Sequence, residues 1–304
     1  MVRVVEEYLE RWAKPRKRTW PEDQRMLQKD VLPRWGRRKA KEITRHDVVK
    51  MLDEMQDRGA TTTANRTLAC VRKMFNFAVS RGVVDVSPCL GVQAPVAERQ
   101  RDRVLTLEEM RAFWNGLDQA GMSEGTRLAL KLQFLTATRK GEVVTASWAD
   151  FDLVGGWWTL PVESSKNKMA HRIPLSSQAL SILERIKALS GDSPWLFPSR
   201  IPGRHVGQTS VDHALRKNLA VLGVEQFTPH DLRRTAASLM TGMGVSRLVV
   251  SKILNHVEQG ITAVYDRHSY DAEKRLALDA WGRRLEAIVT GQPETNVVPL
   301  RVMA

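Results

Sequence analysis

The sequence predicts a mainly α-helical protein with one small β-sheet, and three observations support this fold class. Apolar residues recur at helical spacing through most of the 304 residues. A strand-like pattern replaces that spacing in one place, between Trp157 and Leu175. A polar, charged stretch without apolar periodicity, Ala97–Arg103, separates two helical regions. We therefore expect two domains, the second of which contains the sheet.

The expected domain boundaries follow the breaks in this pattern. Residues 1–95 are expected to form a helical domain, and residues 96–105 a linker. Residues 106–290 are the expected second domain, and residues 291–304 a loose tail. Single domains usually run to roughly 100–200 residues, so two domains suit the length of the chain.

In the first domain, three apolar stripes have the spacing of helices that bury one face. The stripes are Val4, Val5, Tyr8, Leu9 and Trp12; Val48, Met51, Leu52 and Met55; and Leu68, Val71, Phe75 and Ala78. Thr44 and Asp47 are placed to cap the start of the second of these helices.

The second domain begins with a capping box and then mixes helices with two strands. In chain order we expect a helix after Thr106–Glu109, a helix through Leu128, Leu132 and Leu135, strands at 157–162 and 171–175, and helices from Leu180 to about Ile288. Gly191, Gly223 and Gly244 are the expected breaks between the later helices.

The charge of the chain favours a polyanionic partner. Its 47 lysines and arginines outnumber 34 carboxylates, which gives a net charge of +13 and a pI near 10.1. Residues 1–50 alone hold 15 basic and 8 acidic side chains. The dense basic clusters, which we expect to contact DNA phosphates, are Arg16, Lys17 and Arg18, and Arg37, Arg38, Lys39 and Lys41.

Several other classes of protein are disfavoured by what the sequence contains. Its apolar runs are shorter than the roughly 18 residues of a membrane-spanning helix, and its start lacks the apolar core of a signal peptide. Cys70 and Cys89 form no CxxC pair, so we expect reduced, buried thiols in a cytoplasmic protein. Neither zinc spacing nor a phosphate-binding glycine loop occurs, so we expect no metal, ATP or other cofactor.

Four separated segments place phosphate-seeking or nucleophilic side chains beside a turn or a helix end. They are Thr136-Ala-Thr-Arg-Lys-Gly-Glu142, His230-Asp-Leu-Arg-Arg-Thr235, Leu254-Asn-His256 and Ile261-Thr-Ala-Val-Tyr-Asp-Arg267. His230 and Arg233 are three residues apart and share one helix face. Tyr265 follows His256 by nine residues.

These segments, in this order and spacing, resemble the tyrosine recombinase (phage integrase) family, and in particular prophage and genomic-island integrases. A Trp in the helix after the tyrosine, here Trp281, belongs to the same pattern. The resemblance covers about residues 1–290. It implies an N-terminal helical core-binding (SAM-like) domain followed by a mixed α/β catalytic domain.

The resemblance also implies a role for each motif residue. Arg139 and Arg233 match the two arginines, His230 and His256 the two histidines, Tyr265 the nucleophile, Lys166 the lysine of the hairpin, and Glu142 a supporting acidic residue. Lys168 is an alternative to Lys166, and Tyr270 is a rival to Tyr265. Relatives often have Gly before the first arginine, where this chain has Ala137-Thr138, a change that we expect to be harmless.

The chemistry of DNA cleavage by tyrosine makes the same demands independently of the family. Attack of the phenol oxygen on a phosphodiester builds a dianionic transition state, which guanidinium forks stabilise by bidentate contacts. A phenol with a pKa near 10 needs a base, for which His230 is the candidate. Lys166 can protonate the departing 5′ oxygen. Because a 3′-phosphotyrosyl bond conserves the energy of the phosphodiester, rejoining requires no ATP.

The family resemblance implies double-stranded DNA attachment sites as the substrate, a homotetramer on paired sites, and a possible DNA-bending accessory protein. One alternative is a type IB topoisomerase-like enzyme, which would act as a monomer. Another is a DNA-binding regulator without cleavage activity, since Gly244–His256 resembles a recognition helix after a tight turn. Many integrases of this group also carry an arm-binding domain before the core-binding domain, and the chain begins without one, either naturally or by truncation.

Overall fold

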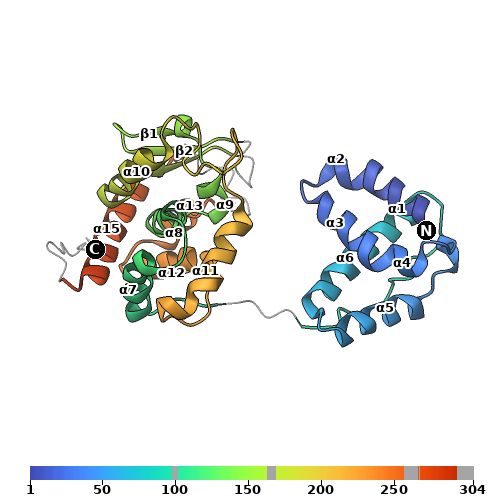
Figure 1. Cartoon of the computed structure of the whole chain (residues 1–304). Helices are drawn as coiled ribbons and strands as arrows, with labels where there is room; N and C mark the ends of the chain where they lie inside the picture. Colours follow the sequence, from blue (N-terminus) through green and yellow to red (C-terminus); the bar gives the residue numbers. More distant parts are fainter. Residues whose placement is uncertain (98–101, 163–168, 257–265, 267, 293–304) are drawn as a thin grey trace, which may run out of the picture. The chain divides into compact units, whose positions relative to one another are not determined.

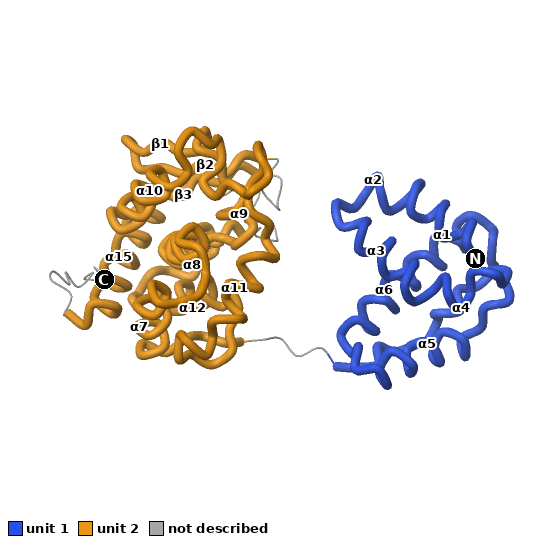
Figure 2. Tube along the Cα trace, in the orientation of Figure 1, with its two compact units in different colours: residues 1–101 blue, residues 102–304 orange. Residues whose placement is uncertain are grey.

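The computed structural model describes residues 1–97, 102–162, 169–256, 266 and 268–292. The chain divides into two compact units, residues 1–101 and 102–304 (Figure 2). Each unit encloses its own cluster of buried apolar residues, which is the minimum that an independent fold requires.

The regular elements among the described residues of unit 1 are all helices (Figure 1). Its elements are α1 (Val2–Tyr8), the π-helical η1 (Leu9–Ala13), α2 (Lys14–Arg16), α3 (Trp20–Met26), the π-helical η2 (Leu27–Val31), α4 (Leu32–Trp35), the 3-10 helix η3 (Ala40–Glu42), α5 (Arg45–Asp57) and α6 (Thr61–Ser80). The three predicted apolar stripes lie on α1 with η1, on α5 and on α6, where most of their residues are buried. Thr44 and Asp47 cap α5 as predicted.

Unit 2 combines helices with a small sheet. Its elements are α7 (Leu107–Gly116), η4 (Leu117–Gln119), α8 (Glu124–Thr136), α9 (Lys140–Val144), η5 (Trp148–Asp150), β1 (Phe151–Asp152), β2 (Trp157–Leu160), β3 (His171–Pro174), α10 (Ser177–Ser190), α11 (Gln208–Leu222), α12 (Pro229–Gly242), α13 (Arg247–Ile253) and α15 (Asp271–Thr290). Thr106 and Glu109 form the predicted capping box of α7.

The sheet is antiparallel, in the order β1-β2-β3. Trp157 pairs with Pro174, and Leu160 pairs with His171. β2 and β3 are the two predicted strands. β1 has two residues, too few for an alternating pattern to be recognised, so the sequence did not indicate it. The mainly α fold with a small sheet is confirmed.

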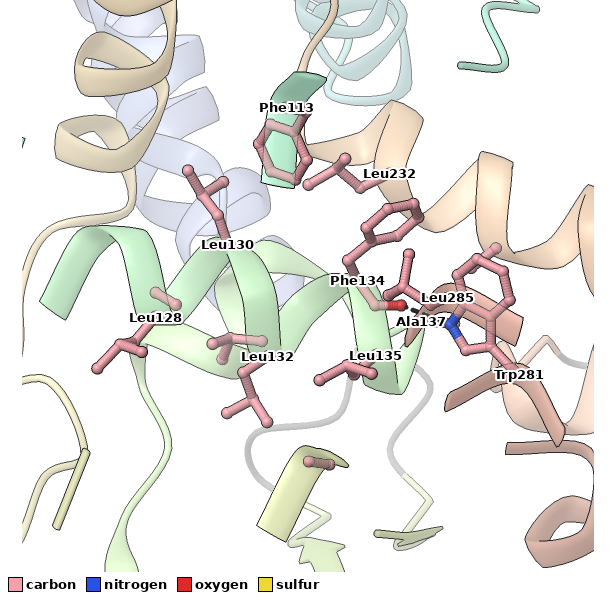
Figure 3. Packing of buried hydrophobic residues seen from close by; sticks show 14 of the residues in the cluster. Phe113, Leu128, Leu130, Leu132, Phe134, Leu135, Ala137, Leu232, Trp281 and Leu285 are labelled. Carbon is pink, nitrogen blue, oxygen red and sulfur yellow. Dashed lines mark hydrogen bonds between the residues drawn. The ribbon is translucent and has the colours of Figure 1, made fainter. Parts of the chain in front are cut away.

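The core of unit 2 is built around α8, against which α10, α12 and α15 pack. Figure 3 shows Phe134 of α8 between Phe113 and Trp281. Its ring centroid lies 6.1 Å from that of Phe113 and 5.3 Å from that of Trp281, both in edge-to-face geometry. The indole Nε1 of Trp281 donates to the Phe134 carbonyl oxygen at 2.9 Å. Trp281 therefore anchors α15 to the core of its own chain, where it is fully buried.

Cys70 and Cys89 are both free and buried, as predicted. Within the described ranges, none of the helices has the length and apolar character that a bilayer crossing would demand.

Candidate active site

The first candidate arginine, Arg139, lies where α8 ends and α9 begins. The chain leaves α8 through Ala137, whose φ of 50° lies in the left-handed region that favours glycine. Arg139 is the N-cap residue of α9, and its backbone N–H donates to Glu142 Oε2 at 2.7 Å. Its guanidinium donates to Glu142 Oε1 at 2.8 Å. The buried Glu142 thus orients both the backbone and the side chain of Arg139.

The second candidate arginine, Arg233, lies in the first turns of α12 and is 3% exposed. A capping box of Thr228 and Asp231 starts this helix. The Arg233 Nη1 donates to the Ala137 carbonyl at 2.7 Å, and its Nη2 donates to the Leu254 carbonyl. Arg233 therefore bridges the C-terminal ends of α8 and α13, which lie far apart in the sequence.

The end of α13 is a tight turn that presents its carbonyl groups to these arginines. Asn255 has a φ of 47° and donates its N–H to Lys252 at 3.0 Å, while the His256 N–H donates to Ser251 at 3.1 Å. These two bonds form a Schellman turn, with Asn255 in the position that usually holds Gly. The Arg139 Nη2 lies 3.5 Å from the Leu254 carbonyl and 3.4 Å from that of Asn255. Both guanidinium groups thus meet at one peptide oxygen.

The centre carries an excess of positive charge. Burial, followed by the nearby charge of Arg139, lowers the pKa of Arg233 to about 10, against a smaller raising effect of Glu142. Arg233 still carries its charge at neutral pH. One carboxylate accompanies two guanidinium groups, so the arrangement suits a ligand that brings negative charge.

The two candidate histidines stand at the exposed side of this centre. Burial lowers the pKa of His230, as do the charges of Arg234 and Arg233. Burial also lowers the pKa of His256, followed by the charges of Arg233 and Arg139. Both imidazoles are therefore neutral at pH 7, so each has one nitrogen that accepts a proton and one that donates.

Other predicted residues fall outside the described residues or are engaged elsewhere. Lys166, its alternative Lys168, and Tyr265 lie outside the described residues. The rival nucleophile Tyr270 is described, and its hydroxyl donates to Asp266 at 3.0 Å. The Lys252 ammonium lies 4.8 Å from the centre of the Tyr270 ring. These contacts hold Tyr270 beside Asp266 at the start of α15.

Comparison with known families decides the class of the protein. The phage integrase family model matches residues 103–272, and the phage integrase central-domain model matches residues 3–94. The first match covers more than half of the chain. The chain belongs to the phage integrase family. It is therefore a site-specific DNA recombinase of the tyrosine type, as the four motifs predicted.

Curated relatives of this phage integrase family member include two prophage integrases of Escherichia coli K12. Prophage integrase IntA is 29% identical over 93% of this chain and 70% of its own length. Prophage integrase IntZ is 28% identical over 87% of this chain and 65% of its own length. The chain thus spans about two thirds of the length of these relatives.

Solved integrase structures share the fold. A lambda integrase fragment (residues 75–356), crystallised as a dimer bound to a core site, matches 84% of this chain and 94% of its own with a TM-score of 0.70 at 19% identity. The Tn1549 transposon integrase bound to circular-intermediate DNA matches 90% of this chain with a TM-score of 0.63 at 14% identity. At these identities the likeness concerns the fold.

In this integrase family member, the predicted DNA-contacting side chains of unit 1 fall into two groups. Five are exposed, namely Arg16, Arg18, Arg37, Lys39 and Lys41. The other two are held by carboxylates. The Lys17 ammonium lies 2.6 Å from Asp23, and Arg38 lies 2.7 Å from Asp47.

Motif reasoning missed the groups that support the arginines. The carbonyl groups of Ala137 and Leu254 bind Arg233, but main-chain atoms leave no mark in a sequence pattern. His171 of β3 also reaches the end of α13, since its Nε2 lies 3.1 Å from the Ile253 carbonyl. The sequence carries no signal for this contact, because His171 and Ile253 become neighbours only through the tertiary fold.

Proposed function

We propose that the protein cuts one DNA strand at a time at attachment sites and rejoins it through a 3′-phosphotyrosyl bond to Tyr265. In this proposal the Tyr265 oxygen bonds to the scissile phosphorus, and the bond to the 5′ oxygen breaks. Rejoining reverses these steps with a 5′ hydroxyl of a partner strand. The observation that supports it is the meeting of two guanidinium groups, those of Arg139 and Arg233, at the Leu254 carbonyl, with the imidazoles of His230 and His256 close enough for these charges to lower their pKa.

In the proposed reaction, Arg139 and Arg233 bind the nonbridging oxygens of the scissile phosphate. Their positions are set before DNA arrives, because Glu142 orients Arg139 and two carbonyl groups orient Arg233. Preorganised donors stabilise developing charge without reorganising during the reaction, and each is worth on the order of 3 kcal/mol.

The histidines and a lysine handle protons. His230 accepts the phenolic proton of Tyr265, which its lowered pKa permits because the imidazole is neutral at pH 7. His256 donates a hydrogen bond to a phosphate oxygen. Lys166, or alternatively Lys168, gives a proton to the departing 5′ oxygen. During rejoining these groups perform the reverse proton transfers, so no proton is gained or lost over the whole reaction.

We further propose that residues 1–95 form a core-type DNA-binding domain and that residues 106–290 form the catalytic domain. The exposed basic side chains of unit 1 would contact phosphates on the duplex. Assembly of four copies on two paired sites, possible help from a DNA-bending protein, and action in the cytoplasm belong to this proposal. Lambda integrase has been crystallised as a tetramer bound to a Holliday junction, which supports the tetramer.

The test uses a duplex that carries the candidate attachment site with a nick beside the cleavage position. Because the nick lets a short end diffuse away, a covalent protein–DNA adduct accumulates. Wild-type protein should form the adduct without ATP or added metal, and Tyr265→Phe should form none. Tyr270→Phe is the matched control and should retain adduct formation, since its hydroxyl is bonded to Asp266.

Each outcome is informative. An adduct that forms with Tyr265→Phe but not with Tyr270→Phe would show that Tyr270 is the nucleophile. Relaxation of supercoiled DNA by a monomer, without exchange between two sites, would favour the topoisomerase alternative. Tight, specific binding to a verified site without any adduct would favour the regulator.

A further inference from the structure

His171 makes a buried contact that the mechanism above does not use. It is the first residue of β3, is 7% exposed, and its Nε2 lies 3.1 Å from the Ile253 carbonyl oxygen. Because a carbonyl oxygen only accepts, the proton of this hydrogen bond belongs to Nε2. His171 and Ile253 are 82 residues apart in the chain, so this bond ties the sheet to the last turn of α13.

That last turn is also the part of the molecule that holds the arginines. The final carbonyl groups of a helix have no partner within the helix, and they form the negative end of its dipole. Here three successive carbonyls receive donors from other elements. Ile253 accepts from His171, Leu254 accepts from Arg233 and Arg139, and Asn255 accepts from Arg139.

β3 is itself held by contacts with α15, so a bond to β3 can fix the position of α13. Lys274 of α15 is 4% exposed, donates to the Arg172 carbonyl at 2.8 Å, and lies 2.9 Å from the Asp271 carboxylate. The neighbouring residues His171 and Arg172 therefore connect β3 to two helices, α13 and α15. The chain between these two helices contains the proposed nucleophile.

We propose that His171 is a positioning residue for DNA cleavage, which fixes the C-terminal turn of α13 through the Ile253 carbonyl and so sets the place of Arg139 and Arg233. This inference rests on the proposed function of the two arginines. A displacement of about 1 Å at reacting groups can cost on the order of 100-fold in rate, so the loss of one such tether is measurable.

The chemistry of the site fits this role and no direct part in proton transfer. Burial, followed by the charges of Lys274, Arg233 and Arg139, lowers the pKa of His171 to about 4, although the hydrogen bond to Ile253 acts in the opposite direction. The ring is therefore neutral with a single proton, which the Ile253 carbonyl holds. A residue that acts only as a tether can be replaced by any side chain that presents an N–H at the same place.

Three substitutions of the full chain separate tethering from general packing. His171→Gln can place its amide N–H where Nε2 lies, His171→Asn is too short to do so, and His171→Leu keeps volume without a donor. For each we would measure the rate of adduct formation on the nicked site at saturating DNA, the DNA dissociation constant, and thermal unfolding.

We expect His171→Leu and His171→Asn to slow adduct formation about 10- to 100-fold, with DNA affinity within about twofold of wild type. His171→Gln should recover most of the rate. Combined with Arg139→Lys, His171→Leu should cost less than it costs alone, because both changes disturb contacts with the same turn at the end of α13.

The inference is overturned if folded His171→Leu and His171→Asn cleave at the wild-type rate, or if His171→Gln is as slow as they are. If His171→Leu fails to fold, the comparison of His171→Gln with His171→Asn decides in the same way. Absence of an adduct with wild-type protein would instead contradict the proposed function, which keeps the two failures distinct.

Discussion

The basic clusters of unit 1 and the arginine centre of unit 2 differ in the partners that hold their side chains. In unit 1, several are neutralised by carboxylates: Lys17 lies beside Asp23, Arg38 beside Asp47, and Arg58 beside Asp30. In the centre of unit 2, Arg233 is held by the carbonyl groups of Ala137 and Leu254, which carry no net charge. Arg139 combines both kinds of partner, Glu142 and the end of α13.

The kind of partner decides whether the positive charge of a basic side chain remains available to a ligand. A carboxylate fixes a basic side chain but cancels its field, and a hydrogen bond from Arg38 holds the pKa of Asp47 below its usual range. A carbonyl group fixes the side chain and leaves its charge in place. The positive charge of unit 2 is thus preserved at the point where a phosphate is expected to bind.

Arg233→Lys tests this contrast with the largest expected effect. A lysine keeps the charge, but its single ammonium cannot span the two carbonyls and a phosphate as the guanidinium fork does. We expect the rate of adduct formation at saturating DNA to fall about 100- to 1,000-fold, with unchanged DNA affinity. A rate within threefold of wild type would show that charge alone suffices at this position.

The pH dependence of stability tests the end of α13 next. The ordinary His pKa is 6.5, whereas that of His171 in the folded protein is lowered to about 4, so the unfolded chain binds this proton more readily. The contribution of His171 is complete above pH 6.5 and is lost as the pH falls toward 4, by about 3 kcal/mol.

The measurement compares urea unfolding of wild type and His171→Gln at pH 7 and at pH 4.5. The wild type should lose more stability than the variant between these values, because glutamine does not titrate. An equal loss in both proteins would contradict the assignment of this titration to His171.

Lys17→Met tests the carboxylate-held group in unit 1. It leaves the buried Asp23 with the Tyr8 hydroxyl at 2.7 Å but without its cation, so we expect the free energy of unfolding to fall by about 2 kcal/mol. The exposed Arg37 supplies the matched control, since Arg37→Met should change stability by less than about 0.5 kcal/mol.

For DNA binding we expect the opposite order, in which Arg37→Met has the larger effect and Lys17→Met the smaller. Arg37→Met should reduce the slope of log affinity against log salt by about 1, whereas Lys17→Met should leave the slope unchanged. Filter binding or fluorescence anisotropy from 50 to 200 mM salt measures both slopes. Equal slopes for the two variants would remove the distinction between the two groups of basic residues.

The smallest expected effect concerns the turn after α13. Asn255 adopts a φ of 47°, which costs most side chains about 1 kcal/mol but costs glycine little. Asn255→Ala should therefore have a free energy of unfolding about 1 kcal/mol lower than Asn255→Gly. Thermal unfolding of the pair measures this difference, and equal stability would argue against the turn.

Sequence reasoning predicted what local patterns encode. Two helix starts were indicated by capping boxes, which use residues three positions apart. These are Thr106 with Glu109 and Thr44 with Asp47. Apolar residues at helical spacing indicated the long helices, and the change to a strand-like spacing indicated β2 and β3. The motifs named Arg139, His230, Arg233 and His256, which the structure brings to one place.

What the sequence did not predict depends on contacts between distant segments. The basic run of unit 1 did not indicate that Lys17 and Arg38 form ion pairs with Asp23 and Asp47. Nor did it indicate that Arg37 stays exposed. The link from His171 to Ile253 joins residues that only the tertiary fold makes neighbours. Ala137, which is fully buried, adopts a left-handed conformation that its side chain does not favour and that no local pattern indicates.

The most direct test of the account is to locate the covalent bond. The adduct formed on a nicked attachment site can be digested with nuclease and trypsin and then analysed by mass spectrometry. Trypsin places Tyr265 in the peptide 253–267 and Tyr270 in the peptide 268–274, so one spectrum separates them. We predict a nucleotide phosphate on peptide 253–267. Its presence on peptide 268–274 would contradict the assignment of the nucleophile.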